Sequence, residues 1–123
     1  MIMQNHKATG KKGELAAREF LVKNNYEILD TNWRFKKAEI DIIAKDLSED
    51  VLVFFEVKTR TYDYYGNPED FVTERKKQLM LDAASRYMEK INYDWAIRFD
   101  IIGILWKDDN NVVIRHYKDA FFM

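Results

Sequence analysis

The spacing of hydrophobic and polar positions changes along the chain, and each spacing predicts a different element. From Glu14 to Lys23, helix-forming residues carry apolar partners four positions apart, such as Ala17 with Leu21. This spacing predicts a helix that follows a short basic turn at 10–13. Glu14 precedes Ala17 by three positions and Leu21 by seven, so its carboxylate is expected in line with the buried face of the helix.

Segments of strand character surround a second helical pattern. Polar turns bound three strands after the first helix, at Tyr26 to Phe35, Glu39 to Lys45 and Val51 to Arg60, and they predict an antiparallel meander. A helix from Pro68 or Thr73 to about Ile91 then precedes two strands, at Trp95 to Trp106 and Val112 to Tyr117. The order α-β-β-β-α-β-β predicts an α/β fold with a mixed sheet of the α+β kind and flanking helices. We expect one domain over residues 1–123, with residues 1–9 as a flexible tail.

Composition and charge narrow the classes of function. The hydrophobic fraction of 47% argues against disorder, and no apolar run approaches the roughly 18 to 20 residues needed to cross a bilayer. Residues 1–9 lack the apolar stretch of a secretory signal, so we expect a cytoplasmic protein without a membrane partner. Because cysteine is absent, any metal site must use oxygen or imidazole ligands. The net charge of -1 leaves local basic patches as the route to nucleic acid.

The candidate catalytic residues Glu56 and Lys58 lie near the end of the strand from Val51 to Arg60. Alternation along a strand places Leu52, Phe54, Glu56 and Lys58 on one face, and Val51, Val53, Phe55 and Val57 on the other. Both faces begin apolar, so this strand is expected to be central and largely buried. Glu56 and Lys58 then lie at the edge of a core, where unpaired charges are costly and require partners.

The tight turn before this strand predicts a register. If Asp46 pairs with Val51, Asp41 falls beside Glu56 and Glu39 beside Lys58. Two facing carboxylates are destabilising unless something neutralises them, and a divalent cation such as Mg²⁺ would do so. Lys58 would then hold a water or stabilise charge on a phosphate, and Glu14 would bind a second metal or a metal-bound water. The alternative from spacing alone is an ion-pair ladder on the protein surface.

These residues resemble the PD-(D/E)XK nuclease superfamily, whose signature is a helix Glu, an Asp on one strand and Glu-x-Lys on the next. Within that superfamily the chain is similar to the YraN-like family of bacterial proteins, whose fold is similar to archaeal Holliday junction resolvases. The resemblance is carried by the stretches at 10–14, 32–34, 38–43, 53–60, 72–73 with Lys76, 98–100 and 120–121. One departure is Ala38, where the family usually has glycine.

The resemblance implies a restriction-endonuclease-like core and an endonuclease that hydrolyses DNA phosphodiesters, including branched or junction structures. It implies that Asp41, Glu56 and the backbone carbonyl of Val57 bind Mg²⁺ or Mn²⁺, that Lys58 assists the attacking water, and that Glu14 completes the site. Junction resolvases usually act as dimers, so it also implies a homodimer. Two alternatives are a catalytically silent nucleic-acid-binding module of the same fold and a protein-interaction domain.

Other residues are candidates for contacts with nucleic acid. Arg34, Arg60 and Lys76 are candidate phosphate contacts, with ordinary solvated charges as the alternative. Tyr62, Tyr64 and Tyr65 are candidates for stacking on exposed bases, with loop packing as the alternative. Arg98 and Asp100 share a strand face and are expected to form a structural ion pair. We assign no role to His6 or His116.

Overall fold

The computed structural model describes residues 6–61 and 72–121, so the tyrosines at 62, 64 and 65 and the candidate helix start at Pro68 lie outside the described residues. Within these described ranges, two helices and five strands form in the predicted order. Their bounds are α1 His6–Lys23, β1 Tyr26–Phe35, β2 Ala38–Asp46, β3 Val51–Arg60, α2 Glu74–Lys90, β4 Ile97–Asp108 and β5 Asn111–Tyr117. The α-β-β-β-α-β-β order is thus confirmed, and it is the order that the resemblance implies.

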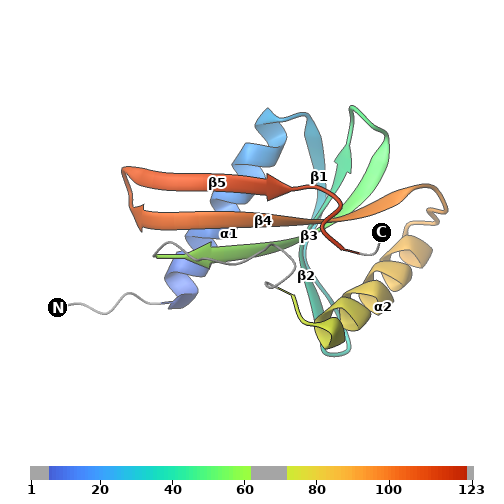
Figure 1. Ribbon diagram of the computed structural model, residues 1–123. Helices are drawn as coiled ribbons and strands as arrows, with labels where there is room; N and C mark the ends of the chain where they lie inside the picture. The colour runs from blue at the N-terminus through green and yellow to red at the C-terminus, as the bar shows by residue number, and fades with distance from the viewer. Residues whose placement is uncertain (1–5, 62–71, 122–123) are drawn as a thin grey trace.

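The five strands form one mixed sheet in the order β1-β2-β3-β4-β5. The first three strands pair antiparallel as the meander predicts, β4 runs parallel to β3, and β5 returns antiparallel to β4. A parallel pair requires a crossover, and α2 supplies it. Figure 1 shows α1 and α2 on opposite sides of the sheet. The mixed sheet with flanking helices is therefore confirmed.

Each helix covers its own hydrophobic cluster. The cluster under α2 contains Leu52 and Phe54 of β3, and the cluster under α1 contains Val53 and Phe55. This is the alternation predicted for a central strand buried on both faces. Glu56 follows Phe54 on the α2 face of β3, which places its carboxylate where that helix begins.

The first helix is longer than the sequence predicts. It begins at His6, so the turn expected at 10–13 is wrong, and the part of the expected tail from residue 6 onward is helical. Gly10 and Gly13 suggested a turn because glycine is a poor helix former. At Gly13 the reason for glycine is packing, since an added Cβ would lie 1.9 Å from Oγ1 of Thr59 on β3. This close approach brings the first turns of α1 against the end of β3.

The structure confirms one predicted helix start and moves the start of one strand. The helix α2 begins at Glu74, and the side chain of its N-cap Thr73 accepts a hydrogen bond from the backbone amide of Lys76. Of the two predicted starts, Thr73 is therefore correct. The strand β4 begins at Ile97, and Trp95, which was expected to start it, is 67% exposed. Within the described residues, no helix is both long and apolar enough to cross a membrane.

Candidate metal centre

The candidate site lies where β2 and β3 separate. Their ladder matches the predicted register from the pair Asp46 and Val51 as far as the pair Ile42 and Phe55. The predicted pairings of Asp41 with Glu56 and of Glu39 with Lys58 lie beyond this ladder, and this part of the prediction is wrong. The backbone amide of Val57 instead donates a hydrogen bond of 2.7 Å to Oδ2 of Asp41. The side chain of Asp41 thus replaces a backbone partner, and the strands open around it.

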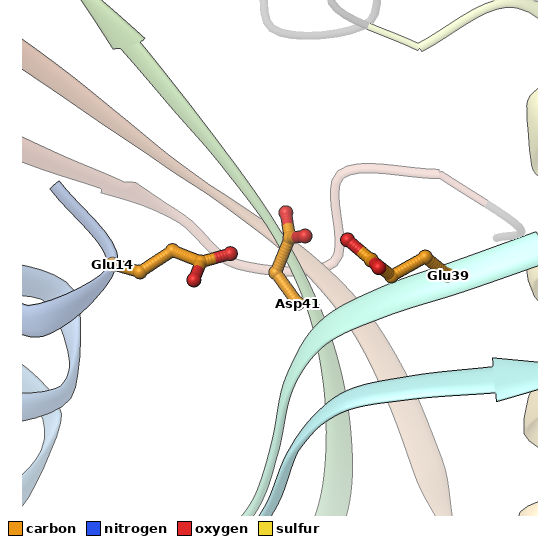
Figure 2. Close-up of side chains that lie close together, drawn as sticks. All are labelled: Glu14, Glu39 and Asp41. Atoms are coloured by element: carbon orange, nitrogen blue, oxygen red, sulfur yellow. The ribbon is translucent and has the colours of Figure 1, made fainter. Parts of the chain in front are cut away.

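Three carboxylates from two elements meet at this opening. Glu14 comes from α1, Glu39 and Asp41 come from β2, and one oxygen from each lies within 4.8 Å of the others. Figure 2 shows the Asp41 carboxylate between those of Glu14 and Glu39, with all three directed toward a common space. Oxygen atoms at this spacing are suitable ligands for a hard divalent cation.

Glu56 contributes a fourth, more deeply buried carboxylate. Its side chain is 3% exposed, and Oε1 forms ion pairs with Nζ of Lys76 at 2.5 Å and Nζ of Lys58 at 3.4 Å. The other oxygen, Oε2, is buried and has no hydrogen-bond partner among the residues that the structure describes. An unpaired buried carboxylate oxygen is costly, so this atom is available to a ligand from outside the chain.

The electrostatics of the opening favour protonation in the absence of a cation. Burial, with the charge of Glu56 as the next cause, raises the pKa of Asp41 to about 8. Burial also raises the pKa of Glu14, helped by the charge of Glu39 and opposed by Arg18 and by hydrogen bonds with Asn32 and Asp41. Carboxylates crowded in this way are neutralised either by protons or by a metal ion.

The structure brings most of the predicted site residues together. Glu14, Asp41 and the Val57 backbone lie in contact, and Glu56 forms ion pairs with Lys58 and Lys76 while its charge raises the pKa of Asp41. The roles predicted for these side chains remain proposals.

The other candidate contacts lie at the edge of this site. Arg34 forms an ion pair of 2.7 Å with Glu39, and the guanidinium of Arg60 donates to the backbone oxygen of Thr59 at 3.2 Å. Sequence reasoning missed Glu39 as a member of the carboxylate group because it assumed an unbroken ladder. The available signal was the Glu-x-Asp spacing, which places Glu39 two positions before Asp41 on the same strand.

The donor set fits a divalent cation of the Mg²⁺ or Mn²⁺ type. All the side-chain donors are carboxylate oxygens, which such ions prefer over nitrogen or sulfur. The partnerless Oε2 of Glu56 and the raised pKa of Asp41 are both features that a bound cation would relieve. These observations make the opening between β2 and β3 a candidate metal centre.

A separate ionic network supports the α1 face of the sheet. The predicted ion pair of Arg98 with Asp100 forms, with both carboxylate oxygens 2.9 Å from guanidinium nitrogens. The same guanidinium also contacts Asp46 at 3.1 Å and the Tyr26 hydroxyl at 2.8 Å. His116, which was assigned no role, has Nε2 2.7 Å from Oδ2 of Asp100. This network is buried in the fold and lies apart from the carboxylates of the candidate metal centre.

Comparison with known proteins places the chain in a family. A model of the uncharacterised protein family UPF0102 matches residues 13–104. UPF0102 proteins of Flavobacterium psychrophilum and Christiangramia forsetii are 47% and 45% identical to the chain, each over 98% of both sequences. A UPF0102 protein of Trichlorobacter lovleyi is 37% identical over 98% of this chain and 95% of its own length.

Among solved structures, the chain is similar to the structure of Pyrococcus furiosus SfsA in complex with Ca²⁺. The TM-score is 0.37 and the identity 11%, over 97% of this chain and 66% of that one, which is too distant to transfer structure or function. The family model and the relatives establish the family without the solved structure, and they confirm the predicted resemblance to the YraN-like family. The chain belongs to the protein family UPF0102.

Proposed function

We propose that this protein is a Mg²⁺- or Mn²⁺-dependent endonuclease that hydrolyses DNA phosphodiesters, including those at branched or junction structures. The observation that carries the proposal is Oε2 of Glu56, a buried carboxylate oxygen without a partner in the described part of the chain. Glu56 lies in the same charged group as Asp41, and the charge of Glu56 raises the pKa of Asp41. The residue types and their strands are those of the PD-(D/E)XK signature, which the sequence resembles.

Asp41, Glu56 and the backbone carbonyl of Val57 would hold the ion, and Glu14 and Glu39 would surround it. When bound, the ion supplies a Lewis acid for the phosphate and lowers the pKa of a coordinated water. The hydrogen bond from the Val57 amide fixes the Asp41 carboxylate against the β3 backbone, so the ligands are positioned before any substrate arrives.

Lys58 is the residue proposed to act on the reacting groups. Its ammonium is 3.4 Å from Glu56 and its side chain is 26% exposed, so it bridges the buried carboxylate and the solvent. From this place it would orient the attacking water and stabilise negative charge that develops on the phosphate. Lys76, at 2.5 Å from the same oxygen, neutralises Glu56 when the ion is absent.

Cations around the carboxylates allow a phosphodiester to approach them. Arg34 pairs with Glu39, Arg18 lowers the pKa of Glu14 through its charge, and the two lysines pair with Glu56. An acidic site without such neighbours would repel a polyanion. The net charge of -1 is therefore compatible with nucleic-acid binding through a local surface.

The test is cleavage of labelled linear, flapped and four-way DNA in Mg²⁺ or Mn²⁺ by the wild type, Asp41→Asn and Glu56→Gln. Lys23→Gln, at the far end of α1, serves as the purification control. We expect cleavage by the wild type and the control, and loss of at least about a hundredfold in both site variants. Equal cleavage by all four proteins, or cleavage by none, would overturn the enzymatic proposal.

Two rival functions make different predictions. A catalytically silent nucleic-acid-binding module would bind DNA with strong salt dependence and cut none of the substrates. A protein-interaction domain would show no salt-dependent affinity for DNA. The proposed enzyme is also expected to form a homodimer, as the resemblance to junction resolvases implies, and light scattering that shows a monomer at high concentration would contradict this.

A further inference from the structure

A cavity with several cationic side chains lies beside the candidate metal centre. It has a volume of about 210 Å³ and opens between the start of β2 and the start of α2. Figure 1 shows the β1–β2 turn next to the first turn of α2. Lys37 and Glu39 line the cavity from the β2 side, and Thr73, Arg75 and Lys76 line it from the α2 side.

The cavity shares two wall residues with the metal centre. Glu39 belongs to the group of carboxylates within 4.8 Å of one another, and Lys76 contacts Glu56 at 2.5 Å. A ligand that fills the cavity is therefore adjacent to anything bound at the centre. Each strand of a nucleic acid carries one phosphate for about every 3.4 Å of helix axis, so a strand at the centre brings further phosphates close by.

The charges in the cavity suit an anion. Among the described residues that line it, three side chains are cationic and one, that of Glu39, is a carboxylate, and the wall also includes the apolar Ala38, Leu79 and Met80. Arg34 already pairs with this carboxylate at 2.7 Å. Lys37 and Arg75 are exposed, and neither forms an ion pair with another residue in the described ranges 6–61 and 72–121. The charges of Lys37 and Arg75 are therefore available to a ligand.

We propose that Lys37 and Arg75 bind a backbone phosphate of DNA next to the phosphate held at the metal centre. This inference rests on the proposed function and extends it, because it makes the substrate a polynucleotide that spans both sites. The contact is with the backbone, so it carries no base specificity.

The experiment measures the affinity for a fluorescent DNA duplex at 50 and 200 mM NaCl, with Ca²⁺ in the buffer. The proteins are the wild type, Lys37→Gln, Arg75→Gln, the double variant and Lys23→Gln, which removes one charge far from the cavity. Each lost phosphate contact reduces the slope of log affinity against log salt by about 0.9. Lys37 and Arg75 share one proposed phosphate, so the fall in affinity between the two salt concentrations should be about three- to fourfold smaller for the double variant than for the wild type.

The single variants should each give about half of that change in slope, and Lys23→Gln should match the wild type. A double variant with the wild-type affinity and slope would overturn the inference.

Cleavage assays on the same proteins keep the two proposals separate. If the wild type cuts DNA but the double variant binds normally, only this inference fails. If binding depends on Lys37 and Arg75 but nothing is cut, only the enzymatic proposal fails. If the wild type binds no DNA, both fail.

Discussion

Oδ2 of Asp41 lies 2.7 Å from the backbone nitrogen of Val57 and accepts its hydrogen bond across the gap between β2 and β3. The bond forms just past the end of the β2–β3 ladder, whose last pair is Ile42 and Phe55. It holds a carboxylate of high pKa against the amide of Val57, the residue whose own carbonyl is a proposed metal ligand. The geometry of the metal centre therefore depends on the separation of these two strands.

The metal-free protein should become less stable as the pH rises toward 8. The folded-state pKa of Asp41, about 8, lies above its ordinary value of 3.8 because of burial first and the charge of Glu56 second. A group with a raised pKa destabilises the fold progressively as the pH rises from its unfolded value through its folded one. In EDTA, thermal melting at pH 9 should therefore occur below that at pH 6, and Asp41→Asn should lessen the difference.

Mg²⁺ should reverse this loss of thermal stability at high pH in the wild type but not in Asp41→Asn. A cation binds the ionised carboxylates, so its stabilising effect grows as the pH rises. Melting of the wild type in EDTA and in excess Mg²⁺ at both pH values measures this directly, with Asp41→Asn as the variant that lacks the effect. If the melting temperature of the wild type at pH 9 were the same with and without Mg²⁺, this would contradict the assignment of the metal centre.

Removal of Arg98 should be among the most damaging substitutions in the chain. Asp100 is fully buried and Asp46 nearly so, and both depend on this guanidinium. Breaking a buried ion pair from one side costs about 3–5 kcal/mol of unfolding free energy. Urea unfolding of Arg98→Met should show this loss, whereas Arg86→Gln, which breaks an exposed pair with Glu89, should cost less than about 1 kcal/mol.

The same network should make the fold sensitive to acid. Burial raises the pKa of Asp100, but hydrogen bonds from His116, Arg98 and the Asp119 amide outweigh it and hold that pKa below its usual value. A lowered pKa stabilises the fold above the unfolded value of 3.8, and this stability is lost as the pH falls below it. Urea unfolding from pH 6 to pH 2 should show the loss, and Asp100→Asn should flatten the curve. A parallel curve for the variant would contradict this account.

Two glycines of α1 should respond to alanine with opposite signs. Among the described residues, no atom outside the neighbouring residues and the backbone of the helix lies within 4 Å of a Cβ added at Gly10, so Gly10→Ala should stabilise the helix by about 0.5–1 kcal/mol. A Cβ at Gly13 would lie 1.9 Å from Oγ1 of Thr59, so Gly13→Ala should destabilise by roughly 1–3 kcal/mol. Adding Thr59→Ala to Gly13→Ala should recover part of the loss in urea unfolding. Equal effects at the two positions would show that α1 does not approach β3 as described.

Local patterns predicted the elements of this fold well. The alternation of β3 specified a strand buried on both faces, and the tight turn after Asp46 specified the register as far as Phe55. These features depend on neighbours in sequence or across one hairpin. The start of α1 was missed because Gly13 reads locally as a turn residue, while its actual neighbour is Thr59, far away along the chain.

The sequence predicted several of the side chains that the structure brings together at the candidate site, but it predicted neither the inclusion of Glu39 nor their geometry. Asp41 and Glu56 were expected as a ladder pair, but the strands separate before reaching them. The separation brings Glu39 into the carboxylate group, and the docking of α2 brings Lys76 onto Glu56. Strand divergence and helix placement are set by packing across the whole sheet, so hairpin register could not reveal them.

The most direct test is a calorimetric titration of Mn²⁺ into the wild type, Asp41→Asn, Glu56→Gln and the distant control Lys23→Gln at neutral pH. It requires no knowledge of the DNA substrate. We expect saturable Mn²⁺ binding by the wild type and the control, with proton release as the carboxylates ionise, and affinity at least about tenfold weaker in both site variants. A wild type that binds no Mn²⁺, or site variants that bind it as tightly as the wild type, would contradict the assignment of the metal centre.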